Sequence, residues 1–321
     1  MTMHAAVVRS FDHPPRYEAY DARAPTSADE VLVDVLAVGL HPRVRTGASG
    51  RHYTSTGQLP MIPGIDGVGR LPDGQRVYFV SPDDTWGSMA ERAIVDLRRI
   101  VPLPEAVDVV KVAAAMNPAM SAWVALRRRV PLQPGQSVLV LGATGNAGGM
   151  AVQVAKRLGA GWVVGAGRNT ERLAELSALG ADGVVALADD PEVTAERLAS
   201  AASEVDVVID YLWGETATIA IMALLKARAD RSRAMDWIQI GAITGPTIEL
   251  PSVALRSANL RLQGTGQGAV SPDVYLAELP SLVEEIDAGT IEVNTREVPL
   301  TEVEATWQNA EVPGVRTVLI P

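Results

Sequence analysis

Hydrophobic positions in the first hundred residues fall in short runs separated by clusters of turn residues. The runs are rich in valine, alanine and isoleucine, and the clearest are HAAVVRS (4–10), EVLVDVLAV (30–38), QRVYFV (75–80) and MAERAIV (89–95). The separating clusters contain glycine, proline, aspartate and serine, as in TGASG (46–50), MIPGIDG (61–67), LPDGQ (71–75) and SPDDTWG (81–87). Short β-forming runs bounded by turn residues predict an all-β, barrel-like region.

The pattern changes after residue 105. Residues 105–130 are helical in composition, with an interruption expected at Pro118. From residue 137 onward, apolar runs alternate with amphipathic helical stretches. The expected strands are 137–142, 161–167, 183–187, 205–212, 237–241 and 260–266, and the expected helices between them are 149–159, 170–180, 191–201 and 216–229. Near-continuous apolar strands that alternate with helices predict a parallel sheet covered on both faces.

The C-terminal segment resembles the first region more than the second. A helix is expected at roughly 272–289, and the runs TREVPL (295–300) and RTVLI (316–320) follow it. We therefore expect a β-rich domain over 1–120, a nucleotide-binding α/β domain over 121–268, and a return to the first domain over 269–321.

Composition and charge narrow the class of protein. A chain of 321 residues is long enough for two domains, and 47% hydrophobic with 21% charged residues is typical of a globular protein. The net charge of −10 gives no basic surface for nucleic acid. The chain has no cysteine, which excludes disulfides, thiolate zinc sites and a cysteine nucleophile. The N-terminus lacks a signal-peptide pattern and no uncharged apolar run spans a membrane, so we expect a cytoplasmic protein.

The stretch LGATGNAGG (141–149) lies between an expected strand and an expected helix. Its spacing is Gly142-x-x-Gly145-x-x-Gly148, with Ala143 where the commonest dinucleotide fingerprint has its first glycine. Such a turn lets backbone amides at a helix N-terminus approach a pyrophosphate. It is also a way to pack a helix closely on a sheet. The flanking strand and helix, and a second strand that ends about 20 residues later, favour nucleotide binding.

The second strand indicates which nucleotide binds. An NAD site usually has a carboxylate there for the ribose 2′-hydroxyl, but this strand ends GAGRN (165–169) without an acid. Arg168 lies at its tip and Arg172 one turn further on. A guanidinium suits a 2′-phosphate, although a solvated surface arginine is the alternative. The sequence predicts NADPH.

The ordered series of motifs resembles the medium-chain dehydrogenase/reductase superfamily, in its zinc-free quinone oxidoreductase branch. The matching segments cover essentially the whole chain: GLHPRVRTGASG (39–50), IPGIDGVG (62–69), NPAMSAW (117–123), the glycine turn with its helix (138–160), VVIDYLWG (207–214), IQIG (238–241) and LQGTGQG (262–268). Asn146 departs from the family's usual glycine. The resemblance implies an α/β protein with a GroES-like β-barrel catalytic domain and a Rossmann doubly wound parallel-sheet cofactor domain.

The resemblance also implies a reaction. Zinc-dependent relatives hold their metal at positions that match His41, Ile65 and Asn117, and this set cannot make a catalytic zinc site, so no metal is expected. Without a Lewis acid, the expected substrates are quinones and α,β-unsaturated carbonyl compounds, in which conjugation spreads the charge that hydride transfer creates. The implied enzyme is an NADPH-dependent quinone oxidoreductase-like reductase.

Candidate site residues follow from the motifs and the resemblance. Tyr53 lies where related enoyl reductases carry a tyrosine acid, with packing against a substrate ring as the alternative. His41 replaces the family's asparagine beside the nicotinamide. Asp66 is expected to brace its loop, and Asp210 to cap a strand end. The expected cofactor-binding residues are Asn117, Thr144, Gly145, Asn146, Ala147, Gly148, Gly167, Arg168, Arg172, Gly241, Ala242, Ile243, Gly264, Thr265 and Gly266.

Two other functions stay open. An enoyl-thioester or 2-alkenal double-bond reductase is one, and Arg43, Arg45 and Arg51 would suit the approach of a charged thioester. A non-catalytic NADPH-binding redox sensor is the other, motivated by His41 and Asn146. The expected partners are a small-molecule quinone or enone and a second copy of the chain, because relatives pair the edge strand that corresponds to NLRLQGT (259–265) in a homodimer. Neither nucleic acid nor a membrane is expected as a partner.

Overall fold

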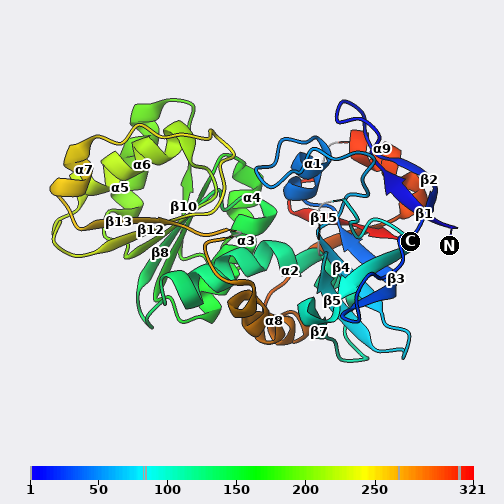
Figure 1. Ribbon diagram of the computed structural model, residues 1–321. Coiled ribbons are helices and arrows are strands. Elements are labelled where there is room, and N and C mark those ends of the chain that lie inside the picture. The colour runs from blue at the N-terminus through cyan, green and yellow to red at the C-terminus, as the bar shows by residue number, and fades with distance from the viewer. Residues whose placement is uncertain (1, 82, 84, 267, 310–311) are drawn as a thin grey trace. The chain divides into compact units, whose positions relative to one another are not determined.

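The computed structural model describes residues 2–81, 83, 85–266, 268–309 and 312–321 (Figure 1). The chain divides into two compact units, Met1–Asn117 with Leu279–Pro321 and Pro118–Glu278. The sequence places the corresponding divisions after residues 120 and 268. Each observed division falls inside a helix, the first in α2 (Val109–Val124) and the second in α8 (Pro272–Asp287).

The first unit is built mainly from antiparallel strands around a hydrophobic core, as the apolar runs predict, and its one parallel pair among the described strands is β14 with β15. One sheet has the order β14-β15-β3-β4-β5-β7, with β6 paired to β3, and β1 pairs with β2 separately. Val33, Phe79, Met89 and Leu319 are among the buried residues between them. The strands are β1 (Thr2–Val7), β2 (Arg16–Asp21), β3 (Glu30–Gly39), β4 (Asp66–Arg70), β5 (Arg76–Val80), β6 (Arg92–Asp96), β7 (Ile100–Pro102), β14 (Asn294–Pro299) and β15 (Val315–Ile320).

Two segments assigned to turns form regular structure instead. The run expected as a turn at 46–50 lies at the end of helix α1 (Pro42–Ala48), because Pro42 is preset for the first position of a helix. The cluster at 61–67 ends in the first residues of β4, because glycines in this strand allow close packing: a Cβ on Gly67 would lie 3.1 Å from the carbonyl oxygen of Ala37. The unit also has short helices α9 (Val303–Gln308), η1 (Leu97–Arg99) and η3 (Leu300–Glu302).

The second unit contains the expected parallel sheet, and the expected fold class is confirmed. Its strand order is β10-β9-β8-β11-β12-β13, with every pair parallel. The order reverses between β8 and β11, the point where open α/β sheets bind ligands beyond the carboxyl ends of their strands. The strands are β8 (Ser137–Leu141), β9 (Trp162–Gly167), β10 (Gly183–Ala186), β11 (Val207–Asp210), β12 (Met235–Gln239) and β13 (Leu260–Gly264).

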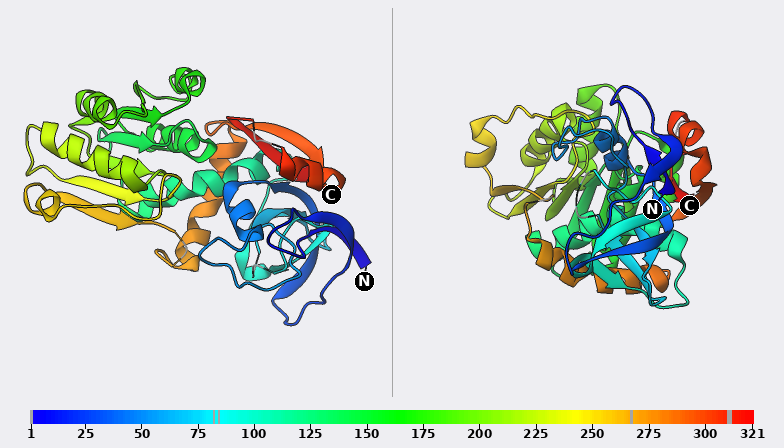
Figure 2. Two further views of the ribbon diagram at one scale, coloured as in Figure 1. Left: turned by 90° about the horizontal axis from the view of Figure 1, so that it is seen from above. Right: turned by 45° about the vertical axis from the view of Figure 1, so that its right-hand side comes forward.

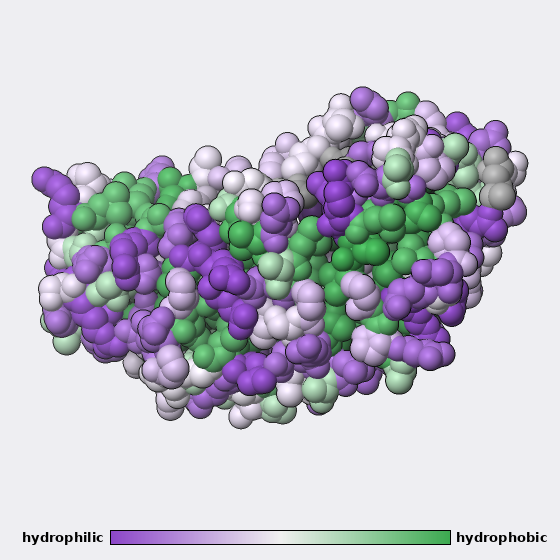
Figure 3. All heavy atoms as spheres, turned by 60° about the horizontal axis from the view of Figure 1, so that its bottom comes forward, coloured by the Kyte–Doolittle hydropathy of each residue, from purple (hydrophilic) through white to green (hydrophobic). Residues whose placement is uncertain are grey.

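Helices cover both faces of this sheet, as Figure 2 shows. The helices are α3 (Asn146–Arg157), α4 (Thr170–Glu175), α5 (Pro191–Ala202), α6 (Gly214–Ala227) and α7 (Ser252–Arg256). Leu139, Val208 and Trp237 are fully buried in the core of the unit. Helix α7 was not predicted. On the face drawn in Figure 3, hydrophobic side chains reach the surface in patches among hydrophilic ones.

Helix α2 continues through Pro118, where an interruption was expected. Its residues Ala113–Met116, Ala119 and Ala122 are buried, so tertiary packing outweighs the loss of one backbone hydrogen bond. A π-helix, Ala125–Arg129, follows directly. Together they form a helix, Val109–Arg129, that is long and apolar enough to cross a membrane by length and composition. Since 72% of its apolar window is buried inside the fold, this is weak evidence for a membrane span.

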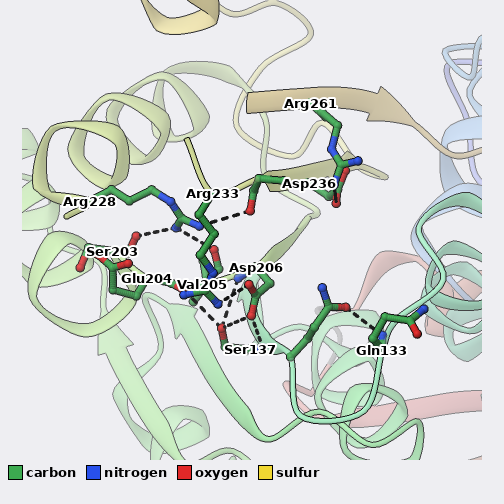
Figure 4. Close-up of polar contacts among 12 residues, drawn as sticks. Gln133, Ser137, Ser203, Glu204, Val205, Asp206, Arg228, Arg233, Asp236 and Arg261 are labelled. Atoms are coloured by element: carbon green, nitrogen blue, oxygen red, sulfur yellow. Dashed lines mark hydrogen bonds and ion pairs between the residues drawn. The ribbon is translucent and has the colours of Figure 1, made fainter. Parts of the chain in front are cut away.

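A polar network holds the amino ends of β8, β11 and β12 together (Figure 4). The carboxylate of Asp206 accepts hydrogen bonds from the amide and hydroxyl of Ser137, at 2.9 and 2.8 Å, and pairs with Arg233. The buried guanidinium of Arg228 donates to the carbonyls of Ser203 and Val205. This network lies at the amino edge, opposite the carboxyl edge at which open α/β sheets bind ligands.

Candidate active and cofactor site

The turn between β8 and α3 has the geometry of a phosphate cradle. Gly142 has a φ of +86°, which favours glycine, and a Cβ on Gly148 would lie 2.2 Å from the carbonyl oxygen of Gly142. Helix α3 begins at Asn146 after Gly145 as its N-cap, with no acidic residue in its first turn. The first amides of a helix have no partner within the helix, so Asn146, Ala147 and Gly148 present free N–H groups at its positive end.

Thr144 and Gly167 lie side by side at the same edge. A Cβ on Gly167 would approach the Thr144 side chain to 2.5 Å, so the absence of a side chain at the end of β9 makes room for the turn. The structure thus brings together the predicted cradle residues of β8, α3 and β9. This edge fits a dinucleotide, because the cradle contains free amides and no carboxylate.

The two arginines predicted for the 2′-phosphate differ in their surroundings. Arg168, directly after β9, is exposed to solvent. Arg172 is buried in α4 and its guanidinium pairs with Glu175, while its amide donates to the N-cap Asn169 at 3.0 Å. Arg168 is therefore the arginine at this strand tip that is open to an incoming anion. The pairing of Arg172 with Glu175 was missed, although the i,i+3 spacing of the two residues signals it.

Two more loops predicted to bind the cofactor lie at the carboxyl edge of the sheet. Gly241 packs on the backbone after β11, since its Cβ would lie 2.5 Å from the carbonyl oxygen of Tyr211. Ala242 and Ile243 follow, and the Ile243 side chain is 69% exposed. Gly264 ends β13, and Thr265 and Gly266 come next. The buried hydroxyl of Thr265 has no hydrogen-bond partner among the described residues, so it is available to a ligand.

Arg129 anchors the loop after β13. Its guanidinium donates to the carbonyl of Gly264 at 3.0 and 3.2 Å and to the carbonyl of Ala269 at 3.3 Å. This residue was not predicted from the sequence. It is one of three consecutive arginines, and the sequence does not indicate which of them contacts a loop 135 residues away.

Asp210 ends β11 and caps the turn that follows it. One carboxylate oxygen accepts the amides of Leu212 and Trp213, at 2.8 and 2.9 Å, and the other accepts the indole N–H of Trp237 at 3.0 Å. Burial raises the pKa of the Asp210 carboxyl. These bonds hold Trp213 at a φ of +55°. All acceptor positions face the protein's own donors, which suits a structural role at the strand end.

The first unit holds a buried chain of polar side chains at the start of α1. The Nε2 atom of His41 lies 3.1 Å from Oδ1 of Asp66, and the phenol of Tyr78 donates to Oδ2 of Asp66 at 2.7 Å. All three side chains are buried. Burial, followed by the nearby charge of Asp66, raises the pKa of Tyr78 well above its usual value, so the phenol stays protonated. The sequence singled out His41 and Asp66 separately but did not predict Tyr78.

The same unit has a pocket lined by residues that neighbour His41 and Asp66 in the sequence. Its lining residues come from α1 and from the loop that leads to β4, and they include Arg43, Val44, His52, Met61 and Ile65. Tyr53 is 74% exposed, with its ring 4.4 Å from that of His52. Asn117 is half-buried in α2, in the same unit as His41.

The described residues contain no cluster of metal-binding side chains. Among the residues that the structure describes, no group of three His, Cys, Asp or Glu side chains is placed to hold an ion. Ile65 and Asn117 occupy two of the three positions that bind zinc in zinc-dependent relatives, and neither supplies a good zinc ligand.

Comparison with known proteins gives the family. Residues 147–271 match the family described as zinc-binding dehydrogenase. The chain is 31% identical to a probable NADPH-dependent quinone reductase of Emericella nidulans, over 99% of this chain and 100% of the relative. A chloroplastic NADPH-dependent alkenal/one oxidoreductase of Arabidopsis thaliana is 27% identical over 57% of this chain and 50% of its own length.

Solved structures agree on the fold over the whole chain. A probable oxidoreductase from Mycobacterium abscessus superposes with a TM-score of 0.79 at 25% identity and covers 100% of both chains. A mycobacterial quinone oxidoreductase reaches a TM-score of 0.82 at 22% identity, over 99% of this chain. With a full-length relative above 30% identity, the chain belongs to the medium-chain dehydrogenase/reductase superfamily, as a relative of its quinone reductases.

Proposed function

We propose that the protein is an NADPH-dependent reductase that transfers hydride to a quinone or to an α,β-unsaturated carbonyl compound. The observation that carries the proposal is the free-amide cradle at Gly145–Gly148, which opens α3 beside the carboxyl end of β9. The name of the full-length Emericella nidulans relative supports the same cofactor and substrate class.

NADPH rather than NADH is favoured by charge. The tip of β9 carries the exposed Arg168 and no carboxylate. A guanidinium can bind a 2′-phosphate with two hydrogen bonds, whereas an NAD site needs an acceptor for the 2′-hydroxyl.

The reaction is proposed to need no zinc. When bound, NADPH supplies a hydride from C4 of its nicotinamide. This chain's residues have to hold the acceptor and stabilise the negative charge that develops on its oxygen. His41 and Tyr53 in the first unit are the candidate donors, and conjugation in a quinone or enone lowers the stabilisation that they must provide.

A panel of acceptors tests the proposal. Purified protein is mixed with NADPH and, separately, an ortho-quinone, a para-quinone, a 2-alkenal and crotonyl-CoA, with NADH in parallel. Turnover of one class with NADPH preferred supports the proposal and identifies its branch. Tight NADPH binding without turnover of any acceptor would support the redox-sensor alternative and contradict a reductase.

The double-bond reductase is retained as a second candidate, because the Arabidopsis thaliana relative is named for alkenal and enone reduction. In the same panel, preference for the 2-alkenal identifies it, and preference for crotonyl-CoA identifies an enoyl-thioester reductase.

Two features of the working protein are also proposals. β13 lies at the end of the strand order, and its pairing with the β13 of a second copy would complete its backbone hydrogen bonds in a homodimer. A chain without cysteine that works with NADPH suits the cytoplasm.

A further inference from the structure

The buried side chains of His41, Asp66 and Tyr78 form a hydrogen-bonded chain with one free end. Tyr78 donates to Oδ2 of Asp66 at 2.7 Å, which leaves Oδ1 to accept from Nε2 of His41 at 3.1 Å. The other ring nitrogen of His41, Nδ1, is buried and has no hydrogen-bond partner among the described residues. A buried polar atom without a partner is costly and is a common mark of a functional role.

The chain fixes the position and the tautomer of the imidazole. A carboxylate accepts only, so its contact with Nε2 requires a proton on Nε2. Asp66 is itself held by the hydroxyl of Ser88, which donates to the Asp66 carbonyl at 2.6 Å. Nδ1 is thus the ring nitrogen that stays open to a substrate.

The backbone at the start of α1 leaves the His41 side chain free to contact Asp66. His41 has extended backbone geometry as the N-cap of α1, and its side chain makes no capping hydrogen bond, so the ring is free to serve another purpose. Arg43 and Val44, which follow in α1, and Ile65, which precedes Asp66, line a pocket. The pocket lining therefore includes chain neighbours of both His41 and Asp66.

We propose that His41 is the proton donor of the reductase, through Nδ1, and that Asp66 and Tyr78 are positioning residues that hold its ring in one orientation. The proposal rests on the proposed function. Hydride arrival at the conjugated carbon places an electron pair on the carbonyl oxygen of the substrate. That oxygen takes the proton from Nδ1, so an O–H bond forms and the Nδ1–H bond breaks. The imidazole is left neutral, with its Nε2–H still hydrogen-bonded to Asp66. Solvent returns a proton to Nδ1 after the product leaves.

Other charged and titratable groups lie on the elements around His41. The buried guanidinium of Arg316 in β15 donates to the carbonyl of Leu40 at 2.7 Å. The charge of Arg43 on α1 acts to lower the pKa of Tyr78, against the larger effect of burial. Asp66 comes from β4 and Tyr78 from β5. The carboxylate of Asp66 is the oppositely charged group that contacts the imidazole directly, at 3.1 Å.

A titration by NMR tests the proposal without turnover. The chain has four histidines, so the Cε1–H resonance of His41 is assigned by its loss in H41N. In D66N, the midpoint of the His41 titration should move to lower pH by about one unit or more, because the imidazolium loses its counter-charge. In Y78F it should move to higher pH, because Asp66 loses a competing donor. Shifts in the same direction, or no shift, would overturn the proposal.

The pH dependence of kcat for an enone gives the second test. In the wild type kcat should fall at high pH as the imidazolium is lost. H41N should lower kcat by about 10²-fold and abolish this alkaline limb, since general acid catalysis contributes on that scale. Y53F should keep the limb. Loss of the limb in Y53F with its retention in H41N would assign the proton to Tyr53 and refute the proposal.

The two failures can be told apart. If the wild type reduces no acceptor but the opposed NMR shifts are seen, the proposed function fails and the coupling of His41 to Asp66 and Tyr78 stands. If the wild type reduces the enone and H41N retains its rate and limb, the proton-donor assignment fails while the reductase stands. If D66N does not fold, the His41 titration in Y78F, which removes only one hydroxyl, still tests the proposal.

Discussion

Individual side chains at the carboxyl edge of the parallel sheet divide into those committed within the protein and those open to a ligand. One carboxylate oxygen of Asp210 accepts a hydrogen bond from the turn after its own strand, and the other accepts from the indole of Trp237. The guanidinium of Arg172 pairs with Glu175. Arg168 and the hydroxyl of Thr265 have no such commitment in the described part of the chain. In the proposed function, we expect cofactor selectivity to depend on these open residues.

Replacing Arg168 with alanine tests this division. Arg168→Ala should weaken NADPH binding by roughly 1.5–3 kcal/mol, the scale of a charge-assisted hydrogen bond, or about 10- to 150-fold in Kd. NADH binding should stay nearly the same, because NADH has no 2′-phosphate. Fluorescence titration with both cofactors measures the difference. Arg256→Ala, at an exposed arginine on α7, is the matched control, and equal losses for NADPH and NADH in Arg168→Ala would refute the assignment.

Site residues that belong to one local motif could be predicted from the sequence. Hydrogen-bonded pairs whose members lie far apart in the sequence could not. The glycines of 142–148 follow from local spacing. The Asp66–Tyr78 bond, the Trp237–Asp210 bond and the Arg129 anchor join residues whose proximity only the folded sheet creates. Side chains of ordinary type at ordinary spacing carry no such signal.

At the scale of elements, α3 can sit on β8 only because Gly148 lacks a side chain. Its Cβ would lie 2.2 Å from the carbonyl oxygen of Gly142 and 2.7 Å from Cα of Ala143, and both are backbone atoms that cannot turn aside. The neighbouring Gly149 has space, with its nearest atom 3.5 Å away at Leu179. Gly148 and Gly149 lie next to each other in α3 but differ in the space for a side chain, so the same substitution at each can be compared.

Gly148→Ala should destabilise the protein by about 1–3 kcal/mol and weaken NADPH binding, because the helix must shift to relieve the overlap. Gly149→Ala should be neutral or stabilise by up to about 1 kcal/mol, since alanine favours a helix. Thermal unfolding of both variants measures the contrast. Equal stability of the two would show that α3 does not depend on the close approach.

The amino ends of the strands depend on the Asp206 network. Burial opposes ionisation of Asp206, but hydrogen bonds from the amide and hydroxyl of Ser137 and the pairing with Arg233 outweigh it, so the pKa of Asp206 is lowered. A carboxyl whose pKa is lower in the folded state stabilises the fold at pH values above its unfolded value. That stability is lost as the pH falls through the folded value.

Asp206→Asn should therefore cost about 1–2 kcal/mol near neutral pH, a figure reduced because Arg233 is half-exposed. The cost should shrink as the pH falls below the model-peptide value of about 3.9 for aspartate. Unfolding at a series of pH values measures it. A difference that stays constant into acid would show that the charge of Asp206 is not what holds the strands.

The elements themselves were predicted well where apolar periodicity was strong. The six strand candidates of the second unit all form, and α5, α6 and α8 begin within a few residues of their expected starts. Short or glycine-rich elements were missed: α1, α7, β2, β4 and β7. Their local preferences are weak, and long-range pairing or packing decides them.

At the scale of the whole molecule, β13 sets the expected assembly. It pairs with β12 on one side, and Leu260, Leu262 and Gln263 are buried or half-buried along it. We expect light scattering to give a dimer at micromolar concentration. A proline in place of Leu262, which removes a backbone donor from the edge, should shift the mass toward the monomer. A wild-type monomer under these conditions would contradict pairing through this strand.

The most direct test of the account is acceptor-dependent oxidation of NADPH by protein that has been treated with a metal chelator, with NADH in parallel. We predict that a quinone or an enone is reduced, that the rate is unaffected by the chelator, and that NADPH is strongly preferred. Loss of activity on chelation, restored by zinc, or the absence of any turnover above the uncatalysed rate, would contradict a zinc-independent NADPH reductase.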